Sequence, residues 1–304
     1  MTAASIDIGS NTLLMLLAEI SNGAILPIQD LQRIPRISAG LLPGGKITDA
    51  SQVRLMNILT EYSSLIKTRN CSRIIISATS AFRKAANSGD LKKKIEDLFD
   101  TEVKILSGNE EAELAFLGTI EYGTKQKHRL VIDIGGGSTE IIYGHNTEID
   151  YRKSFDTGVV SLSEKYFALH KPENTELSSA EHYIRSVFGV LPEFKYAPGN
   201  VVALAGTPVA LACLHAGISD YDESRVEASV LSYDDIAALK RYLAGFSPAE
   251  LLNKYPNILR DRQDLILSGT SILFIIMDLL KIDKVIVSTK GVRYGALIKY
   301  LNLT

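Results

Sequence analysis

The chain has little cysteine and almost no net charge, and both shortages narrow the possible functions. Its two cysteines, Cys71 and Cys213, form no Cys-x-x-Cys pair and have no histidine at metal-ligand spacing. This argues against a disulfide framework or a zinc site, and it indicates a reducing, cytoplasmic environment. The five histidines show no ligand spacing, so none is expected to have a role. The formal net charge is −2, so a polyanionic ligand must be bound by a local basic patch, and nucleic acid is not an expected partner.

Long apolar runs are also missing. The apolar segment 13–20 lacks a preceding basic region, so a secretory signal is not expected. The segment 272–280 is too short to span a bilayer and contains Asp278, which makes a buried helix the better interpretation. We therefore expect no membrane partner. The chain of 304 residues, 46% apolar and 22% charged, is long enough for two globular domains with sizeable cores.

A glycine-rich turn between two strands is the most informative segment. Residues 130–134 are an uninterrupted apolar run typical of a buried strand, and residues 140–143 resume the strand after the break. Glycines in such a turn are expected to adopt positive φ and to gather backbone N–H groups into a nest for phosphate oxygens. The alternative is a plain hairpin whose glycines only relieve strain. The expected phosphate ligands are Gly135, Gly136, Gly137, Ser138 and Thr139.

Two carboxylates flank this turn. Asp133 enters it and Glu140 leaves it, and together they would repel a bare phosphate. The arrangement makes sense if a divalent cation, Mg²⁺ or another, lies between the carboxylates and the anion. The turn therefore predicts a metal-phosphate site.

A second copy of the motif weakens the hairpin alternative. Residues 6–12, Ile-Asp-Ile-Gly-Ser-Asn-Thr, match residues 132–138, and strands flank both copies. The separation is far longer than a solenoid repeat, so it suggests duplication of a whole domain. The first copy adds Asp7 as a metal ligand and Gly9, Ser10, Asn11 and Thr12 as phosphate ligands.

The order of expected strands and helices predicts an α/β fold. Three antiparallel strands open each half, and helix-strand alternation follows. No low-complexity linker separates the halves, so a short hinge is expected between 119 and 127, with domains at 1–122 and 123–304. The final helix is expected to begin near Gly291, and this division of the chain allows it to pack back on the first domain.

Two further turns follow expected strands at the edge where α/β sheets bind ligands. The polar turn 78–83 ends with Arg83, and a guanidinium there suits a bidentate clamp on phosphoryl oxygens. Gly206 and Thr207 follow the strand 201–205, and Pro208 opens a helix.

Six short segments stand out along the chain. They are the two Asp-Ile-Gly turns, residues 78–83 (Ala-Thr-Ser-Ala-Phe-Arg), residues 107–112 (Ser-Gly-Asn-Glu-Glu-Ala), Gly206-Thr207, and residues 287–293 (Val-Ser-Thr-Lys-Gly-Val-Arg). Together they resemble the motifs of the exopolyphosphatase and guanosine pentaphosphate phosphatase family. The resemblance runs from end to end and is closest to the short, two-domain form. It implies two ribonuclease H-like domains flanking a central cleft, as in the actin, sugar kinase and chaperone ATPase superfamily.

The resemblance also implies roles for individual residues. The family's catalytic glutamate falls on Glu111, its arginine on Arg83, and its metal-linked acids on Asp133 and Glu140. The neighbouring Glu110 instead fits the capping box Ser-x-x-Glu that begins at Ser107. A carboxylate in the first helical turn, such as Glu111, is kept ionised by the helix dipole and suits a general base.

We therefore expect a Mg²⁺-dependent hydrolase that releases terminal phosphate from inorganic polyphosphate. Guanosine pentaphosphate is the alternative substrate, and a superfamily ATPase or kinase and a non-catalytic phosphate-chain sensor are the alternative functions. Departures from the family pattern at Leu14, Glu227 and Tyr294 bear on the substrate. A homodimer is compatible with the sequence.

Overall fold

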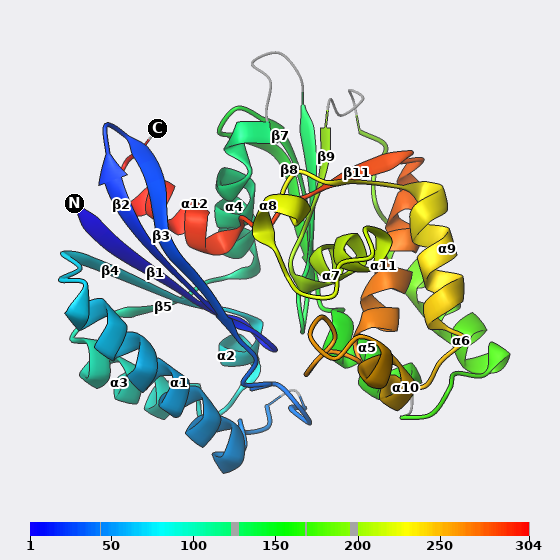
Figure 1. Cartoon of the computed structure of the whole chain (residues 1–304), viewed down its shortest axis with the longest axis horizontal. Helices are drawn as coiled ribbons and strands as arrows, with labels where there is room; N and C mark the ends of the chain where they lie inside the picture. The colour runs from blue at the N-terminus through cyan, green and yellow to red at the C-terminus, as the bar shows by residue number, and fades with distance from the viewer. Residues whose placement is uncertain (43, 123–127, 168, 195–199, 304) are drawn as a thin grey trace. The chain divides into compact units, whose positions relative to one another are not determined.

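The computed structural model describes residues 1–42, 44–122, 128–167, 169–194 and 200–303. Internal contacts divide the chain into two compact units (Figure 1). Unit 1 comprises Met1–Gly118 and Lys290–Thr304, and unit 2 comprises Thr119–Thr289. The chain thus first leaves unit 1 after residue 118, slightly before the expected boundary at 122, and residues 123–127 of the expected hinge lie outside the described residues.

Unit 1 is built on a five-stranded sheet with the order β3-β2-β1-β4-β5. Strands β1 to β3 are antiparallel, and β4 and β5 continue the sheet in parallel with β1. Asn22 and Gly23 both have positive φ at the β2–β3 turn, as a tight hairpin requires. The strands are β1 (Thr2–Ile8), β2 (Leu13–Ser21), β3 (Ala24–Arg33), β4 (Arg73–Ala78) and β5 (Val103–Ile105).

Helices cover both faces of this sheet (Figure 1). Helices α1 (Asp49–Thr68) and α3 (Ser88–Phe99) pack on one face through residues such as Leu59 and Ile95. Helix α12 (Val292–Tyr300) packs on the other face through Tyr294 and Leu297, beside α4 (Gly108–Gly118). The C-terminal helix α12 is therefore part of unit 1.

Unit 2 repeats the arrangement on a six-stranded sheet with the order β10-β11-β9-β6-β7-β8. Strands β6 to β8 are antiparallel, like β1 to β3, and β9 and β11 run parallel to β6, like β4 and β5 to β1. Its strands are β6 (Arg129–Ile134), β7 (Thr139–His145), β8 (Glu148–Phe155), β9 (Asn200–Leu204), β10 (Val230–Ser232) and β11 (Lys284–Val287). This shared order confirms two ribonuclease H-like folds.

The core of unit 2 lies between its sheet and its helices, where Ile132 and Ile141 pack with Ile275 of α11. Helix α11 is almost wholly buried, as expected, and no helix in the described part of the chain is long and apolar enough to cross a membrane. The helices are α5 (Val159–Tyr166), α6 (Asn174–Phe188), α7 (Gly206–His215), α8 (Glu223–Val226), α9 (Tyr233–Leu243), α10 (Pro248–Lys254) and α11 (Ile266–Leu280), with a 3₁₀ turn at Ile120–Tyr122.

One local expectation is wrong. The segment after β4 is not a polar turn, because Ser80–Lys84 form the short helix α2. Phe82 in its centre is fully buried in the core of unit 1, and this packing stabilises a helix too short to persist alone.

Candidate active site

The two glycine turns have the same backbone geometry. The Gly9 N–H donates to Thr12 O at 2.9 Å, and the Gly135 N–H donates to Ser138 O at 3.0 Å. A Cβ atom at Gly9 would lie 2.9 Å from Thr12 O, and one at Gly135 would lie 3.0 Å from Ser138 O. Both contacts are closer than real Cβ atoms tolerate comfortably, so each tight turn needs glycine at its first position.

The expected positive φ angles at these turns are wrong. The described glycines with positive φ are Gly23, Gly40, Gly44 and Gly217, which belong to other turns. Close approach of another backbone segment to the unit 2 turn explains Gly158. A Cβ atom at Gly158 would lie 2.5 Å from Gly135 O, and the first turn of α5 donates Val159 N–H to Gly135 O at 3.0 Å and Val160 N–H to Gly136 O at 2.8 Å.

Asp133 and Glu140 are brought together as expected. They are direct cross-strand partners on β6 and β7, so both side chains lie on the same face of the sheet, with residue exposures of 8% and 1%. Ser154 on β8 donates its hydroxyl to Glu140 Oε1 at 2.6 Å and so orients that carboxylate. Two buried carboxylates with hydroxyl oxygens nearby are a donor set that fits Mg²⁺.

The first turn carries a different donor set. Asp7 pairs with Leu14 in the register of β1 and β2, so leucine stands where unit 2 has Glu140. Asn11 is buried, and its Oδ1 has no hydrogen-bond partner. A buried carbonyl oxygen in that state favours binding of a cation or of a donor from a ligand. Ser10, also buried, is held by a hydrogen bond from the Ser38 N–H to its carbonyl oxygen at 3.0 Å.

The hydroxyl of Thr139 has a structural partner. Thr139 is fully buried, and its Oγ1 donates to Thr157 O at 2.7 Å, so its proton is used inside the protein. Ser138 is buried beside it.

Arg83 and Glu111 form an ion pair within unit 1. Arg83 Nη1 donates to Glu111 Oε2 at 2.6 Å and to Leu106 O at 2.8 Å. Helix α2 supplies the arginine and the first turn of α4 supplies the glutamate. Arg83, which was expected to contact phosphate, thus contacts Glu111, the expected general base.

Burial dominates the electrostatics of Glu111. The residue is 8% exposed, and the loss of water raises the pKa of its carboxyl, while Arg83 and a hydrogen bond from Thr79 oppose part of that rise. A carboxylate whose pKa is moved toward neutrality is a better general base than an ordinary surface glutamate. The helix dipole was expected to keep this group ionised, whereas the net shift of its pKa is upward and burial is the largest cause.

The neighbouring Glu110 has the capping role expected from the sequence. Its Oε2 accepts from the Ser107 N–H at 2.8 Å, and its own N–H donates to Ser107 Oγ at 3.2 Å. The hydrogen bond from the Ser107 N–H, followed by one from the Ser107 hydroxyl, holds the pKa of the Glu110 carboxyl below its usual value. The capping box is confirmed, and the adjacent acids have opposite environments.

Gly206 and Thr207 begin α7 directly after β9, which pairs with the strand of Asp133. Thr207 is buried, and its Oγ1 would lie 2.0 Å from a Cβ atom at Gly269, so its side chain packs closely against α11. No sequence pattern singles out Arg262, whose Nη1 donates to Gly206 O at 3.2 Å. Burial lowers the pKa of this guanidinium, which makes it a desolvated cation beside the turn.

The departures Glu227 and Tyr294 have local structural roles. Glu227 accepts hydrogen bonds from Ser288 and Thr289, which ties the end of α8 to the end of β11. Tyr294 packs under the sheet of unit 1, next to Arg293, which makes a two-point ion pair with Asp30.

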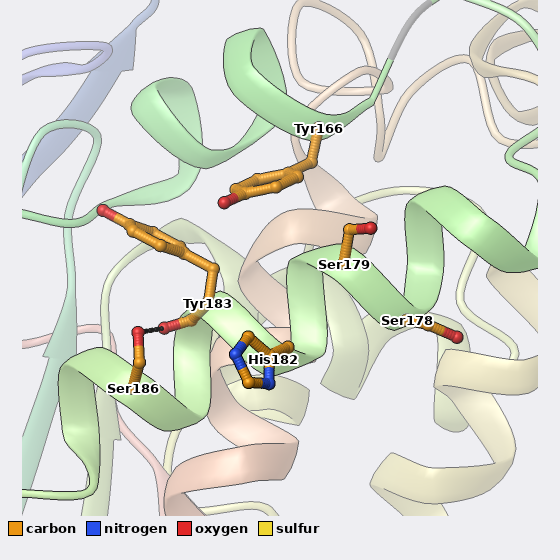
Figure 2. Close-up of a pocket in the computed structure, with 6 residues that line it drawn as sticks. All are labelled: Tyr166, Ser178, Ser179, His182, Tyr183 and Ser186. Atoms are coloured by element: carbon orange, nitrogen blue, oxygen red, sulfur yellow. Dashed lines mark hydrogen bonds between the residues drawn. The ribbon is translucent and has the colours of Figure 1, made fainter.

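A separate hollow of 430 Å³ lies on α5 and α6 in unit 2 (Figure 2). The rings of Tyr166 and Tyr183 lie next to one another, with centroids 5.3 Å apart, and serines and a histidine of α6 line the rest. It contains none of the residues expected to bind phosphate or metal.

Comparisons with known proteins agree with the motifs. The chain is 27% identical over 299 residues to guanosine-5'-triphosphate,3'-diphosphate pyrophosphatase of Pseudoalteromonas translucida, covering 98% of this chain but only 59% of that protein. It is 28% identical over 258 residues to exopolyphosphatase 2 of Mycobacterium tuberculosis, covering 80% of each chain.

Solved structures are similar over nearly the whole chain. The Aquifex aeolicus Ppx/GppA family member has a TM-score of 0.84 and 26% identity, over 99% of this chain and 98% of that one. An exopolyphosphatase from Cytophaga hutchinsonii, at 23% identity, has the same fold with a TM-score of 0.90 over 99% and 98% of the two chains. The model of the Ppx/GppA phosphatase family matches residues 16–303, and the chain belongs to that family.

Proposed function

We propose that this protein is a phosphoanhydride hydrolase that releases terminal orthophosphate from inorganic polyphosphate. The observation that carries the proposal is the pair formed by Glu111 and Arg83: a buried carboxylate with a raised pKa, held by a guanidinium at 2.6 Å. Such a group is suited to accept a proton from water near neutral pH. Family membership supports the reaction class.

In the proposed reaction, the oxygen of a water molecule forms a bond to the terminal phosphorus while the bridging P–O bond breaks. The proton of that water passes to Glu111. Arg83 keeps the carboxylate oriented and adds positive charge near the phosphoryl oxygens as negative charge spreads over them. The bridging oxygen leaves with the shortened chain.

The glycine turns are proposed to bind phosphoryl oxygens through backbone N–H groups and hydroxyls. The N–H groups of Gly9 and Gly135 donate within their own turns, so these two residues would shape the turn rather than donate to the ligand. The chain offers Gly9, Ser10, Asn11 and Thr12 in one unit and Gly135, Gly136, Gly137, Ser138 and Thr139 in the other, with Gly206 and Thr207 at the start of α7. The desolvated Arg262 adds a cation beside Gly206. Thr139 would contribute through its backbone, because its hydroxyl donates to Thr157 O.

Mg²⁺ is the proposed cofactor. Asp133 and Glu140 would hold it in unit 2, and Asp7 is proposed as a metal-binding carboxylate of unit 1. When bound, such an ion neutralises charge on phosphoryl oxygens. The buried carboxylates that face one another across β6 and β7 support the fit of unit 2 to a hard cation. In unit 1, the Asn11 Oδ1 without a hydrogen bond is an oxygen donor of the same kind.

Polyphosphate is proposed as the substrate because the tuberculosis exopolyphosphatase matches over 80% of both chains, whereas this chain spans only 59% of the pyrophosphatase from Pseudoalteromonas. Guanosine pentaphosphate is the second candidate, since that pyrophosphatase aligns with 98% of this chain.

The test measures phosphate release from polyphosphate of defined length, from guanosine pentaphosphate and from ATP, with Mg²⁺ and with a chelator. We expect Mg²⁺-dependent release from polyphosphate that the Glu111→Gln variant lacks. Release from guanosine pentaphosphate but not from polyphosphate would replace polyphosphate by guanosine pentaphosphate as the substrate. No release from either, combined with micromolar ATP binding, would overturn the hydrolase and favour a superfamily kinase or ATPase. Tight polyphosphate binding without turnover in Mg²⁺ or Mn²⁺ would favour a sensor.

A further inference from the structure

Two histidines face one another at the end of the unit 2 sheet that is remote from the glycine turn. The last pair in the β6–β7 register is Arg129 with Gly144, so the next position places His128 opposite His145. Facing residues of an antiparallel pair have side chains on the same side. Their ring centroids are 4.8 Å apart.

A β-bulge adds a carboxylate to this pair. In the β7–β8 register Tyr143 pairs with Tyr151 and Gly144 pairs with Ile149, so Asp150 is an extra residue on β8. Bulges redirect side chains, and here the Asp150 carboxylate reaches both histidines. Its Oδ2 lies 2.9 Å from His128 Nε2 and 3.6 Å from His145 Nδ1.

These distances are close to those between ligands of one metal ion. With metal–ligand bonds of about 2.0–2.1 Å, neighbouring ligand atoms around a tetrahedral ion are about 3.4 Å apart. The three ligand atoms offered by His128, His145 and Asp150 all lie within 4.8 Å of one another. Small side-chain rotations therefore suffice to bring these three atoms to three corners of a tetrahedron around one ion.

Neighbouring groups already orient the two imidazoles. His145 Nε2 lies 3.2 Å from Glu148 Oε2, whereas its Nδ1 is buried and makes no hydrogen bond. A carboxylate on one ring nitrogen fixes the tautomer that presents the other nitrogen to a metal. The His128 ring stacks on Tyr143 at 4.8 Å with an interplanar angle of 12°.

We propose that His128 Nε2, His145 Nδ1 and Asp150 Oδ2 bind a transition-metal ion of the Zn²⁺ class, with water as the fourth ligand. Imidazole nitrogens favour Zn²⁺ and Co²⁺ over Mg²⁺, so this site differs in chemistry from the oxygen donors of Asp133 and Glu140. Along β6 it is about 17 Å from Asp133, given about 3.3 Å per residue. The ion would fasten β6, β7 and β8 together and would not take part in hydrolysis.

The test titrates tag-free, metal-stripped protein with Co²⁺ and follows its visible absorption, with Zn²⁺ competition. We expect saturation at one ion per chain, displacement by Zn²⁺, and a melting temperature that rises with either ion. His145→Ala and Asp150→Asn should each weaken Co²⁺ binding by at least about 100-fold, and Glu148→Gln by about 10-fold because it only orients a ligand.

The matched control is His170→Ala, which removes an exposed histidine that is also paired with a carboxylate, Glu176 at 3.3 Å. It should bind Co²⁺ like the unmodified protein. Circular dichroism of each metal-free variant separates loss of the site from loss of the fold. Equal Co²⁺ affinity in the folded His145→Ala variant, or no saturable binding to the unmodified protein, would overturn the proposal.

Discussion

Arg83 Nη1 and Glu111 Oε2 are 2.6 Å apart although their residues belong to different helices. The pair explains how a carboxylate can be buried in unit 1 without being left as an unpaired charge. Burial still raises the pKa of Glu111, and Arg83 limits the rise. Arg83 therefore extends to lower pH the range in which the proposed base, Glu111, is ionised.

Replacing Arg83 by glutamine should move the acidic limb of the kcat/KM profile to higher pH. Loss of the cation leaves burial less opposed, so the pKa of Glu111 rises further and the base is protonated over a wider range. The control is Arg33→Gln, which breaks an ion pair of 2.7 Å with Glu61 whose side chains are 41% and 45% exposed. That variant should keep the original profile. An unchanged or lower midpoint for Arg83→Gln would contradict the electrostatic role.

Glu111 should also make folding stability depend on pH. Its folded pKa is raised above the ordinary 4.5, so the folded state holds the proton more tightly, and this stabilising contribution is lost as pH rises through the folded pKa. Glu111→Gln does not ionise. Its melting temperature relative to the unmodified protein should therefore be higher at pH 8 than at pH 5. A difference in melting temperature that does not change with pH would show that ionisation of the buried Glu111 carboxyl does not destabilise the folded protein.

Asp133→Asn should raise the Mg²⁺ concentration needed for half-maximal activity, because asparagine is a neutral and weaker ligand. Excess Mg²⁺ should restore part of the rate. Ser154→Ala removes only the hydroxyl that orients Glu140 and should cost about 10-fold in metal affinity. Loss of activity in Asp133→Asn that no Mg²⁺ concentration repairs would argue against a ligand role.

Gly295→Ala tests the packing of α12 on α4. A Cβ atom there would lie 1.8 Å from Leu114 O, so the helices must separate, and we expect a loss of about 3 kcal/mol or more in the free energy of unfolding. Gly89→Ala is the matched control, since a Cβ atom there meets nothing within 4 Å and alanine is the better helix former. Urea denaturation compares the two. Equal stabilities would mean that α12 shifts without cost.

Features set by neighbouring residues could be predicted from the sequence. Ser107 and Glu110 form the expected capping box, because that signal needs only four residues. The repeated Asp-Ile-Gly motif likewise predicted two similar sheets.

Features set by distant residues could not be predicted from such patterns. Arg262 reaches the carbonyl of Gly206, 56 positions earlier, and a single extra residue in β8 brings Asp150 to His128. The positive φ expected for the glycine turns was wrong, and at Gly9 and Gly135 the constraint is instead a carbonyl oxygen three residues later that a Cβ atom would crowd. Tertiary packing decides the positions of Arg262 and Asp150.

The turnover of two single-residue variants tests the proposed mechanism most directly. Glu110→Gln keeps a group able to fill the third position of the capping box, so it should retain most activity and lose no more than about 1 kcal/mol of stability. Glu111→Gln cannot accept a proton, so kcat for polyphosphate should fall by roughly 10²- to 10⁴-fold, while substrate binding stays near normal or tightens. If Glu110→Gln is the inactive variant, or if both retain turnover, Glu111 is not the general base.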